Sequence, residues 1–123
     1  APTRAIVERL KARCSGVPII GFPKGAGGNL ARYARETGVD AVGLDETVDL
    51  GWADEAVPEG LPVQGNLDPL LLLAGGEALA GAVRRIRRAL GRRPHVFNLG
   101  HGIDKETPIA HVEAALAAIR SPL

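Results

Sequence analysis

The chain has 123 residues, of which 46% are hydrophobic, and this suits one globular domain with a modest core rather than a disordered segment. Fifteen Lys and Arg residues against fourteen Asp and Glu residues leave a formal net charge of +1, which gives no electrostatic reason to expect nucleic acid or a membrane surface as a partner. The single cysteine, Cys14, cannot form an internal disulfide, and we find neither a secretory signal nor a membrane-spanning stretch, so we expect a cytoplasmic protein.

Short apolar runs alternate with helical patterns along the chain. The opening segment, APTRAIVERLKAR, predicts a helix with Ile6, Val7 and Leu10 on its apolar side. Four runs bounded by Pro, Gly or Asp follow: VPIIGF at 17–22, VDAVGL at 39–44, LPVQGN at 61–66 and PHVFNLG from Pro94. Runs of this kind predict strands that are buried on both faces.

Helical patterns fill the intervals between these strands. One pattern, marked by Leu30, Tyr33 and Ala34, ends near Gly38, and a short one covers about 49–56. The clearest runs from about 76 to 90, and the last begins at Pro108 with Thr107 as its expected N-cap. The apolar stripes of these two helices are Leu79, Val83, Ile86 and Leu90, and Ile109, Val112, Leu116 and Ile119. Four successive strand–helix units predict the α/β class, with parallel strands covered by helices.

The first three strands recur every 22 residues, from 17 to 39 to 61, a period that leucine-rich solenoids also use. The L-x-x-L-x-L signature of those repeats is absent, and the interval from 61 to 94 is 33 residues. We therefore favour a packed α/β sheet over a solenoid.

Polar side chains follow every predicted strand. In parallel α/β folds, ligands bind where the strands end and the helices have not yet begun. We call these strand-end segments the rim. Its polar residues are Lys24 after the first strand, Asp45 after the second, Gln64, Asn66 and Asp68 at the third, and Asn98, His101 and Asp104 at the fourth.

Several of these features also have a purely structural interpretation. The segment PKGAGGN matches neither G-x-G-x-x-G nor the Walker pattern, so simple turn chemistry is favoured over an anion site. Asp45 and Asp68 suit helix caps, and surface or cap roles are expected for His95 and His111. A run of arginines between 84 and 93 is best explained as a solvated helix face, and Cys14 has no partner at metal-ligand spacing.

His101 stands out because a glycine flanks it on each side. Glycines permit unusual backbone angles and a close approach of ligand. The imidazole of His101 could donate a hydrogen bond to a carboxylate or carry charge near neutral pH. From the residues alone, a turn role and a ligand-binding role remain equally supported.

At all four strand ends the sequence resembles the C-terminal part of the uroporphyrinogen decarboxylase family. The segments that carry the resemblance are GFPKGAG (21–27), AVGLDETV (41–48), VQGNLDP (63–69) and FNLGHGI (97–103). Their order and spacing match, and the resemblance covers essentially the whole chain. The pair QGNLDP and NLGHGI is the most specific part of it.

This resemblance implies a (β/α)8 TIM barrel that converts uroporphyrinogen III to coproporphyrinogen III without a cofactor or metal. Residues 1–123 would form the C-terminal half of that barrel, with the N-terminal half absent and a homodimer as the full-length form. His101 falls on the family's substrate-binding histidine. Rim contacts are expected from Lys24, Asp45, Gln64, Asn66 and Asn98.

Two departures from the family pattern matter. Glu46 stands where the family often has Trp, which puts that contact in doubt. The family's catalytic aspartate and arginine-bearing motif match nothing here, so we expect no catalytic residue in this chain. The chain alone should not decarboxylate, and its open sheet edges should make it dimerise, aggregate or require the missing half.

Two other functions remain as alternatives. A related barrel methyltransferase, acting on corrinoid or thiol methyl groups, would use zinc ligands at strand ends, and no Cys lies at one here. A non-catalytic porphyrin-binding α/β domain is compatible with the same polar rim.

Overall fold

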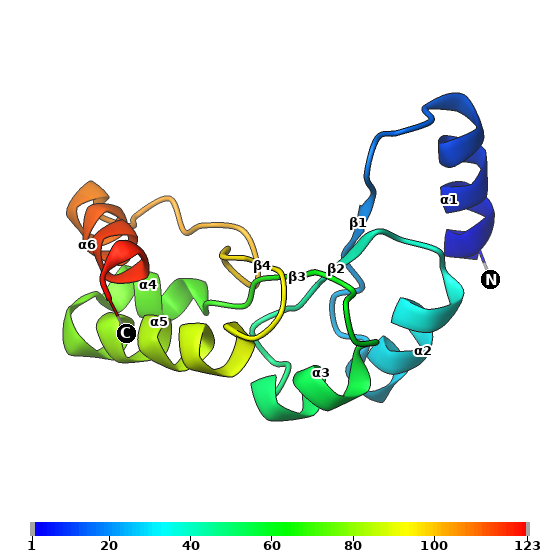
Figure 1. The fold of residues 1–123 in the computed structure, drawn as a ribbon. Helices are drawn as coiled ribbons and strands as arrows, with labels where there is room; N and C mark the ends of the chain where they lie inside the picture. Colours follow the sequence, from blue (N-terminus) through cyan, green and yellow to red (C-terminus); the bar gives the residue numbers. More distant parts are fainter. Residues whose placement is uncertain (1, 123) are drawn as a thin grey trace.

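The computed structural model describes residues 2–122, in which helices and short strands alternate as the sequence predicts (Figure 1). The elements are α1 (Pro2–Arg13), β1 (Ile20–Gly21), the 3-10 helix η1 (Gly27–Asn29), α2 (Leu30–Glu36), β2 (Ala41–Gly43), α3 (Leu50–Ala56), β3 (Val63–Gln64), α4 (Pro69–Ala74), α5 (Gly76–Leu90), β4 (His95–Val96) and α6 (Ile109–Arg120).

The four strands form one parallel sheet in the order β1-β2-β3-β4. Val42 pairs in register with Gly21 on one side and Val63 on the other, and Val63 pairs with His95. A further bridge joins Leu67 to Leu99 beyond the strands. Because all strands run the same way, the four segments that follow them lie along one edge of the sheet. The predicted parallel α/β arrangement is thereby confirmed.

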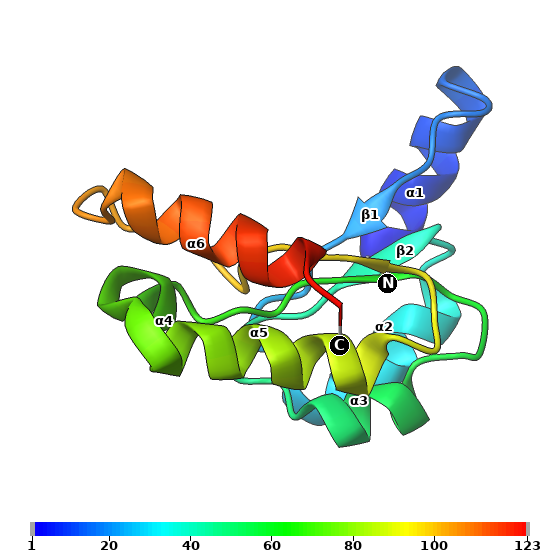
Figure 2. The same ribbon diagram turned by 60° about the vertical axis from the view of Figure 1, so that its left-hand side comes forward.

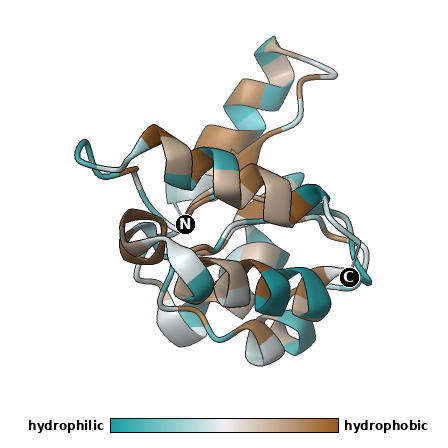
Figure 3. Ribbon diagram, turned by 90° about the vertical axis from the view of Figure 1, so that its left-hand side faces the viewer, coloured by the Kyte–Doolittle hydropathy of each residue, from teal (hydrophilic) through white to brown (hydrophobic). Residues whose placement is uncertain are grey.

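Helices cover one face of the sheet and enclose the core. The helix α5 is central to this layer, since it contacts α3, α4 and α6 (Figures 1 and 2). Its stripe of Leu79, Val83, Ile86 and Leu90 is buried, as the sequence predicts, and packs with Val42 and Val63 of the sheet and with other core residues. The exposed side of α5 carries charged residues, whereas α4 and α6 leave Leu70, Ile109 and Leu116 exposed, so hydrophilic and hydrophobic segments alternate on the outer surface (Figure 3). The predicted apolar stripe of α6 is therefore only partly buried.

The opposite face of the sheet is open at its edges, so the prediction of strands buried on both faces is confirmed for β2 and wrong for β1 and β4. Side chains alternate across a strand, which directs Ile20, Gln64 and Val96 away from the helices. Ile20 and Val96 are 46% and 50% exposed, and Phe22, just after β1, is 46% exposed. Among the described residues no second layer lies over this face.

Two aspartates cap helices, and two expected caps are absent. Asp45 caps no helix, because it accepts from Thr47 N in the turn before α3, whose N-cap is Asp49. Asp49 accepts a hydrogen bond from Trp52 N at the start of α3, and Asp68 accepts one from Leu70 N at the start of α4, as expected for Asp68. Thr107, by contrast, makes no cap. Pro108 occupies the N-cap position of α6 in an extended conformation, so the helix begins one residue later than predicted.

The helix α1 stands apart from the others in both views (Figures 1 and 2). Only Val7 of this helix is buried, and the ion pair between Lys11 and Asp40, at 2.7 Å, ties its end to the segment before β2. No helix within residues 2–122 has the length and apolarity needed to cross a membrane.

Candidate functional site at the rim

Asp45 is the most buried charged residue of the rim, with 3% of its surface exposed. One carboxylate oxygen accepts a hydrogen bond from Gly25 N at 2.7 Å, which links the segment after β2 to the segment after β1. The other oxygen accepts hydrogen bonds from the backbone N–H of Thr47, at 2.9 Å, and from the Thr47 hydroxyl. Burial raises the pKa of Asp45, but the hydrogen bonds from Thr47 and Gly25 outweigh it and leave the pKa below its ordinary value.

Asn66 joins the segment after β3 to the same place. Its side-chain amide donates hydrogen bonds to Asp45 O at 3.1 Å and to Val48 O at 2.9 Å. The preceding residue, Gly65, has φ near +118°, and an added Cβ there would collide with the carbonyl oxygen of Leu44. Glycine is therefore required for the close approach of the segments that follow β2 and β3.

The loop that carries His101 rests directly on this cluster. Gly100 N donates a hydrogen bond to Leu67 O at 2.8 Å. A Cβ added to Gly100 would lie 2.8 Å from Glu46 Cα, 2.9 Å from Asp45 C and closer still to Glu46 N. Neither glycine beside His101 has a positive φ, so the expectation of unusual backbone angles is wrong. Gly100 is needed because backbone atoms crowd it, while Gly102 meets nothing within 4 Å.

His101 itself is exposed, and its imidazole makes no hydrogen bond to any residue within 2–122. Its position therefore depends on the backbone of its loop. An exposed imidazole with both ring nitrogens unengaged is available to bind a carboxylate of a ligand.

Lys24 and Glu46 form an ion pair of 2.7 Å across the segments that follow β1 and β2. The hydrogen bond from Lys24 holds the pKa of Glu46 below its ordinary value. The second oxygen of Glu46 is buried and accepts no hydrogen bond within the described part of the chain. Glu46, at a position where Trp was expected, is thus charged and paired with a residue of the rim.

The side chains of the three remaining predicted rim residues make no hydrogen bond to the Asp45 cluster. Asp104 is exposed and accepts a hydrogen bond from Glu106 N at 2.8 Å. Asn98 is exposed and its side chain accepts a hydrogen bond from Leu99 N at 2.8 Å. Gln64 is half-buried, and the alternation of β3 places it on the open face of the sheet. Substrate contact by Lys24, Asp45, Gln64, Asn66 and Asn98 stays a prediction.

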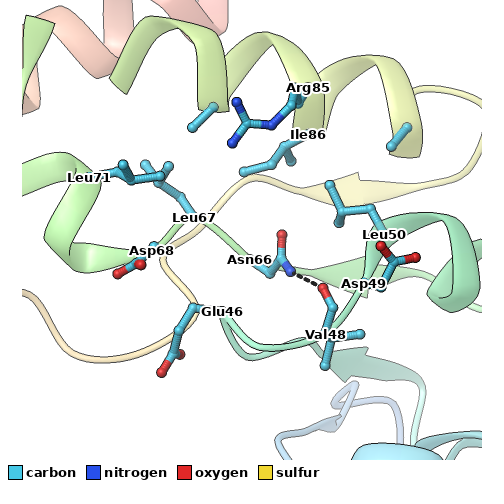
Figure 4. Close-up of a pocket in the computed structure, with 12 residues that line it drawn as sticks. Glu46, Val48, Asp49, Leu50, Asn66, Leu67, Asp68, Leu71, Arg85 and Ile86 are labelled. Atoms are coloured by element: carbon cyan, nitrogen blue, oxygen red, sulfur yellow. Dashed lines mark hydrogen bonds between the residues drawn. The ribbon is translucent and has the colours of Figure 1, made fainter. Parts of the chain in front are cut away.

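A cleft of about 470 Å³ lies between α5 and the rim (Figure 4). Arg85 reaches into it from α5, the Asn66 amide turns toward Val48, and the Glu46 side chain points away from α5 (Figure 4). Of its three acidic residues, Asp49 and Asp68 serve as the helix caps described above, and Glu46 pairs with Lys24. The cleft belongs to the helical side of the rim, and His101 does not line it.

The other two histidines have structural positions. His111 lies with Nδ1 at 3.1 Å from Leu72 O and 3.0 Å from Leu73 O, near the end of α4, in keeping with its expected cap role. The ring of His95 is half-buried and hydrogen-bonded to Gly65 O, so a surface role for it is wrong. Burial lowers the pKa of His95 and favours the neutral ring.

Sequence reasoning missed two contributors to this region, Thr47 and the crowding at Gly100, and one contact at the opposite edge of the sheet, that of Arg93. Thr47 was detectable, because an aspartate accepting from the backbone two residues later is a common turn. The crowding at Gly100 and the role of Arg93 depend on contacts between distant segments. Arg93 departs from the solvated arginine run: its side chain is 8% exposed and bonds to Asp54 Oδ1 and Asp54 O, both at 2.9 Å.

A parallel sheet with helices on one face and polar residues at its carboxyl edge is the arrangement found in one part of a β/α barrel, a class of protein that binds its ligands at that edge. The family model for uroporphyrinogen decarboxylase (URO-D) matches residues 1–122. The chain belongs to this family, which has the TIM-barrel fold, and its four parallel strands correspond to half a barrel.

Similar proteins agree with this assignment. The chain is 68% identical over 120 residues to a uroporphyrinogen decarboxylase of Rhizorhabdus wittichii, covering 98% of this chain and 35% of that protein. It is 63% identical over 120 residues to one of Sphingopyxis alaskensis, with the same coverage, and 58% identical over 121 residues to one of Erythrobacter litoralis, covering 98% and 36%. The chain thus spans about a third of the length of these curated relatives.

Proposed function

We propose that this chain is part of a uroporphyrinogen decarboxylase, which converts the four acetate side chains of uroporphyrinogen III to methyl groups. The match of the family model to residues 1–122 carries the proposal. We further propose that the full-length protein is a cytoplasmic homodimer that needs no cofactor and binds no nucleic acid.

The reaction sets out what the site must supply. In each step the bond between the methylene carbon and the carboxylate breaks, and carbon dioxide leaves. For this to happen the pyrrole ring first takes up a proton on carbon, so that the electron pair of the broken bond can flow into the ring. The methylene carbon then takes up a proton to complete the methyl group, and the ring loses the proton that it had gained. The substrate carries four acetates and four propionates, which makes eight carboxylates. Groups that bind carboxylates must therefore surround it.

Within this scheme we assign His101 to substrate binding. It is exposed, it lies on the loop after β4, and its ring nitrogens are free of protein hydrogen bonds within residues 2–122. The lysine of the Lys24–Glu46 pair adds a cation at the same rim. The resemblance places the aspartate and arginines of the reaction elsewhere in the barrel, so the isolated chain is expected to be inactive.

The test is an anaerobic assay of the full-length protein with uroporphyrinogen, in which coproporphyrin is measured by fluorescence after oxidation. The His101→Ala variant should raise KM or lower kcat/KM about 10-fold or more, as expected when a charge-assisted contact to substrate is lost. Lys105→Ala is the matched control, because Lys105 is exposed on the same loop and should leave the kinetics unchanged. Absence of turnover by the folded wild-type protein would refute the proposed function.

A further inference from the structure

The segments that follow all four strands meet at Asp45 and Glu46. The carboxylate of Asp45 holds the segment after β1, its backbone oxygen holds Asn66 after β3, and the backbone of Glu46 lies against Gly100 after β4. We propose that Asp45 is a positioning residue: it sets the place of His101 through the rim backbone and does not touch the substrate. This inference rests on the proposed function.

The first argument is that the Asp45 carboxylate is fully used by the protein. It is 97% buried by its neighbours, since only 3% of the residue is exposed. Three donors, Gly25 N, Thr47 N and the Thr47 hydroxyl, already occupy its two oxygens. A carboxylate has room for about four such bonds, so little capacity remains for a ligand.

The second argument is the short path from Asp45 to His101. Asn66 donates to Asp45 O and so binds the start of the segment 65–68. That segment accepts the hydrogen bond of Gly100 N through Leu67 O. On its other side Gly100 abuts the backbone of Glu46, the residue that follows Asp45. Gly100 is therefore held between the segment 65–68 and the backbone of Glu46, and Asp45 joins these two segments. His101 is the next residue after Gly100, so its position follows theirs.

The third argument is that His101 has no other anchor among the described residues. Its side chain is exposed and free of hydrogen bonds within residues 2–122. Within residues 2–122 the imidazole is therefore placed only through its backbone. A displacement of about 1 Å at such a group is enough to lower catalysis about 100-fold.

The chain offers a matched control in Asp40. Like Asp45, it lies close to β2 and accepts a backbone N–H from the neighbouring segment, in this case Ile19 N at 2.8 Å. It also pairs with a lysine, Lys11, at 2.7 Å. Asp40 precedes β2, however, and therefore lies at the opposite edge of the sheet from His101. Asp40→Asn therefore shows how much kcat/KM changes when a comparable carboxylate is lost away from the rim.

The experiment is a double-mutant cycle on kcat/KM in the full-length protein. Asp45→Asn should lower kcat/KM about 10-fold in the wild-type background but less than about twofold when combined with His101→Gln, because both changes remove the same contact. Asp40→Asn should change kcat/KM less than about twofold in either background. An equal effect of Asp45→Asn with and without His101 would overturn the proposal.

Two further measurements cover the remaining outcomes. If Asp45→Asn does not fold, Thr47→Val removes one donor only and should show the same dependence on His101, with a loss of about threefold. If the wild-type protein has no activity, the proposed function fails, and the NMR signals of the His101 ring still test the positioning. Those signals, assigned by His101→Gln, should shift or broaden in Asp45→Asn and stay unchanged in Asp40→Asn. Unchanged signals in Asp45→Asn would refute the inference.

Discussion

The two glycines that flank His101 differ in their surroundings, which makes Gly100→Ala and Gly102→Ala a matched pair. A Cβ on Gly100 would lie 2.8 Å from Glu46 Cα, whereas ordinary contact begins at 3.4 Å. The loop must therefore move by at least 0.6 Å, the difference between 3.4 and 2.8 Å, since the opposing atoms are backbone. A Cβ on Gly102 meets nothing within 4 Å.

Gly100→Ala should destabilise the full-length protein by about 1–3 kcal/mol, as overpacking in a rigid site does. It should also lower kcat/KM with uroporphyrinogen by about 10-fold to 100-fold, because the displaced backbone carries His101 with it. Gly102→Ala should change both quantities little. Urea denaturation and the anaerobic turnover assay measure the two effects, and indistinguishable results for the two variants would refute the crowding at Gly100.

Three further predictions concern stability and association. Burial lowers the pKa of His95, so the unfolded chain binds a proton more readily, and the folded state should lose stability as the pH falls from about 7.5 to about 5.5. His95→Gln should weaken this dependence in urea titrations at the two pH values, and an unaltered dependence would contradict it. Arg93→Met should cost about 2 kcal/mol, because Asp54 O loses a charged donor at the end of α3; a urea midpoint equal to wild type would exclude that role. Residues 1–123 alone should associate through the open edges at β1 and β4 and the exposed apolar side chains beside them, and light scattering from a monomer with a cooperative melt would contradict this.

The sequence predicted those features whose causes are local. The helix over 76–90 follows from the spacing of Leu79, Val83, Ile86 and Leu90, and the cap at Asp68 follows from its own side chain and the proline after it. The alternation of strands and helices then requires a parallel sheet, which the structure contains. Each of these inferences needs only residues that are close in the chain.

The features that the sequence did not predict depend on distant segments. Whether β1 and β4 are buried on both faces depends on chain that would lie over Ile20 and Val96, and no pattern within a strand reports it. The sequence also did not show why a glycine is needed at position 100. The backbone atoms that crowd it belong to Asp45 and Glu46, more than fifty positions earlier in the chain. The sequence predicted that Arg93 is solvated, because it belongs to the run of arginines that ends beside α5. Its hydrogen-bond partner Asp54 lies on α3, far away in the chain.

Most contacts that join the rim segments use main-chain atoms on at least one side, and this has a consequence for how the protein can diverge. The N–H of Gly25 and the carbonyl of Val48 are supplied by any residue that keeps the backbone path. Amino-acid identity is therefore constrained chiefly at Asp45, Gly65, Asn66 and Gly100. Lys24 and Glu46 lie outside that constraint, so relatives can exchange these two without rebuilding the scaffold. Sequence differences between relatives should accumulate at that pair.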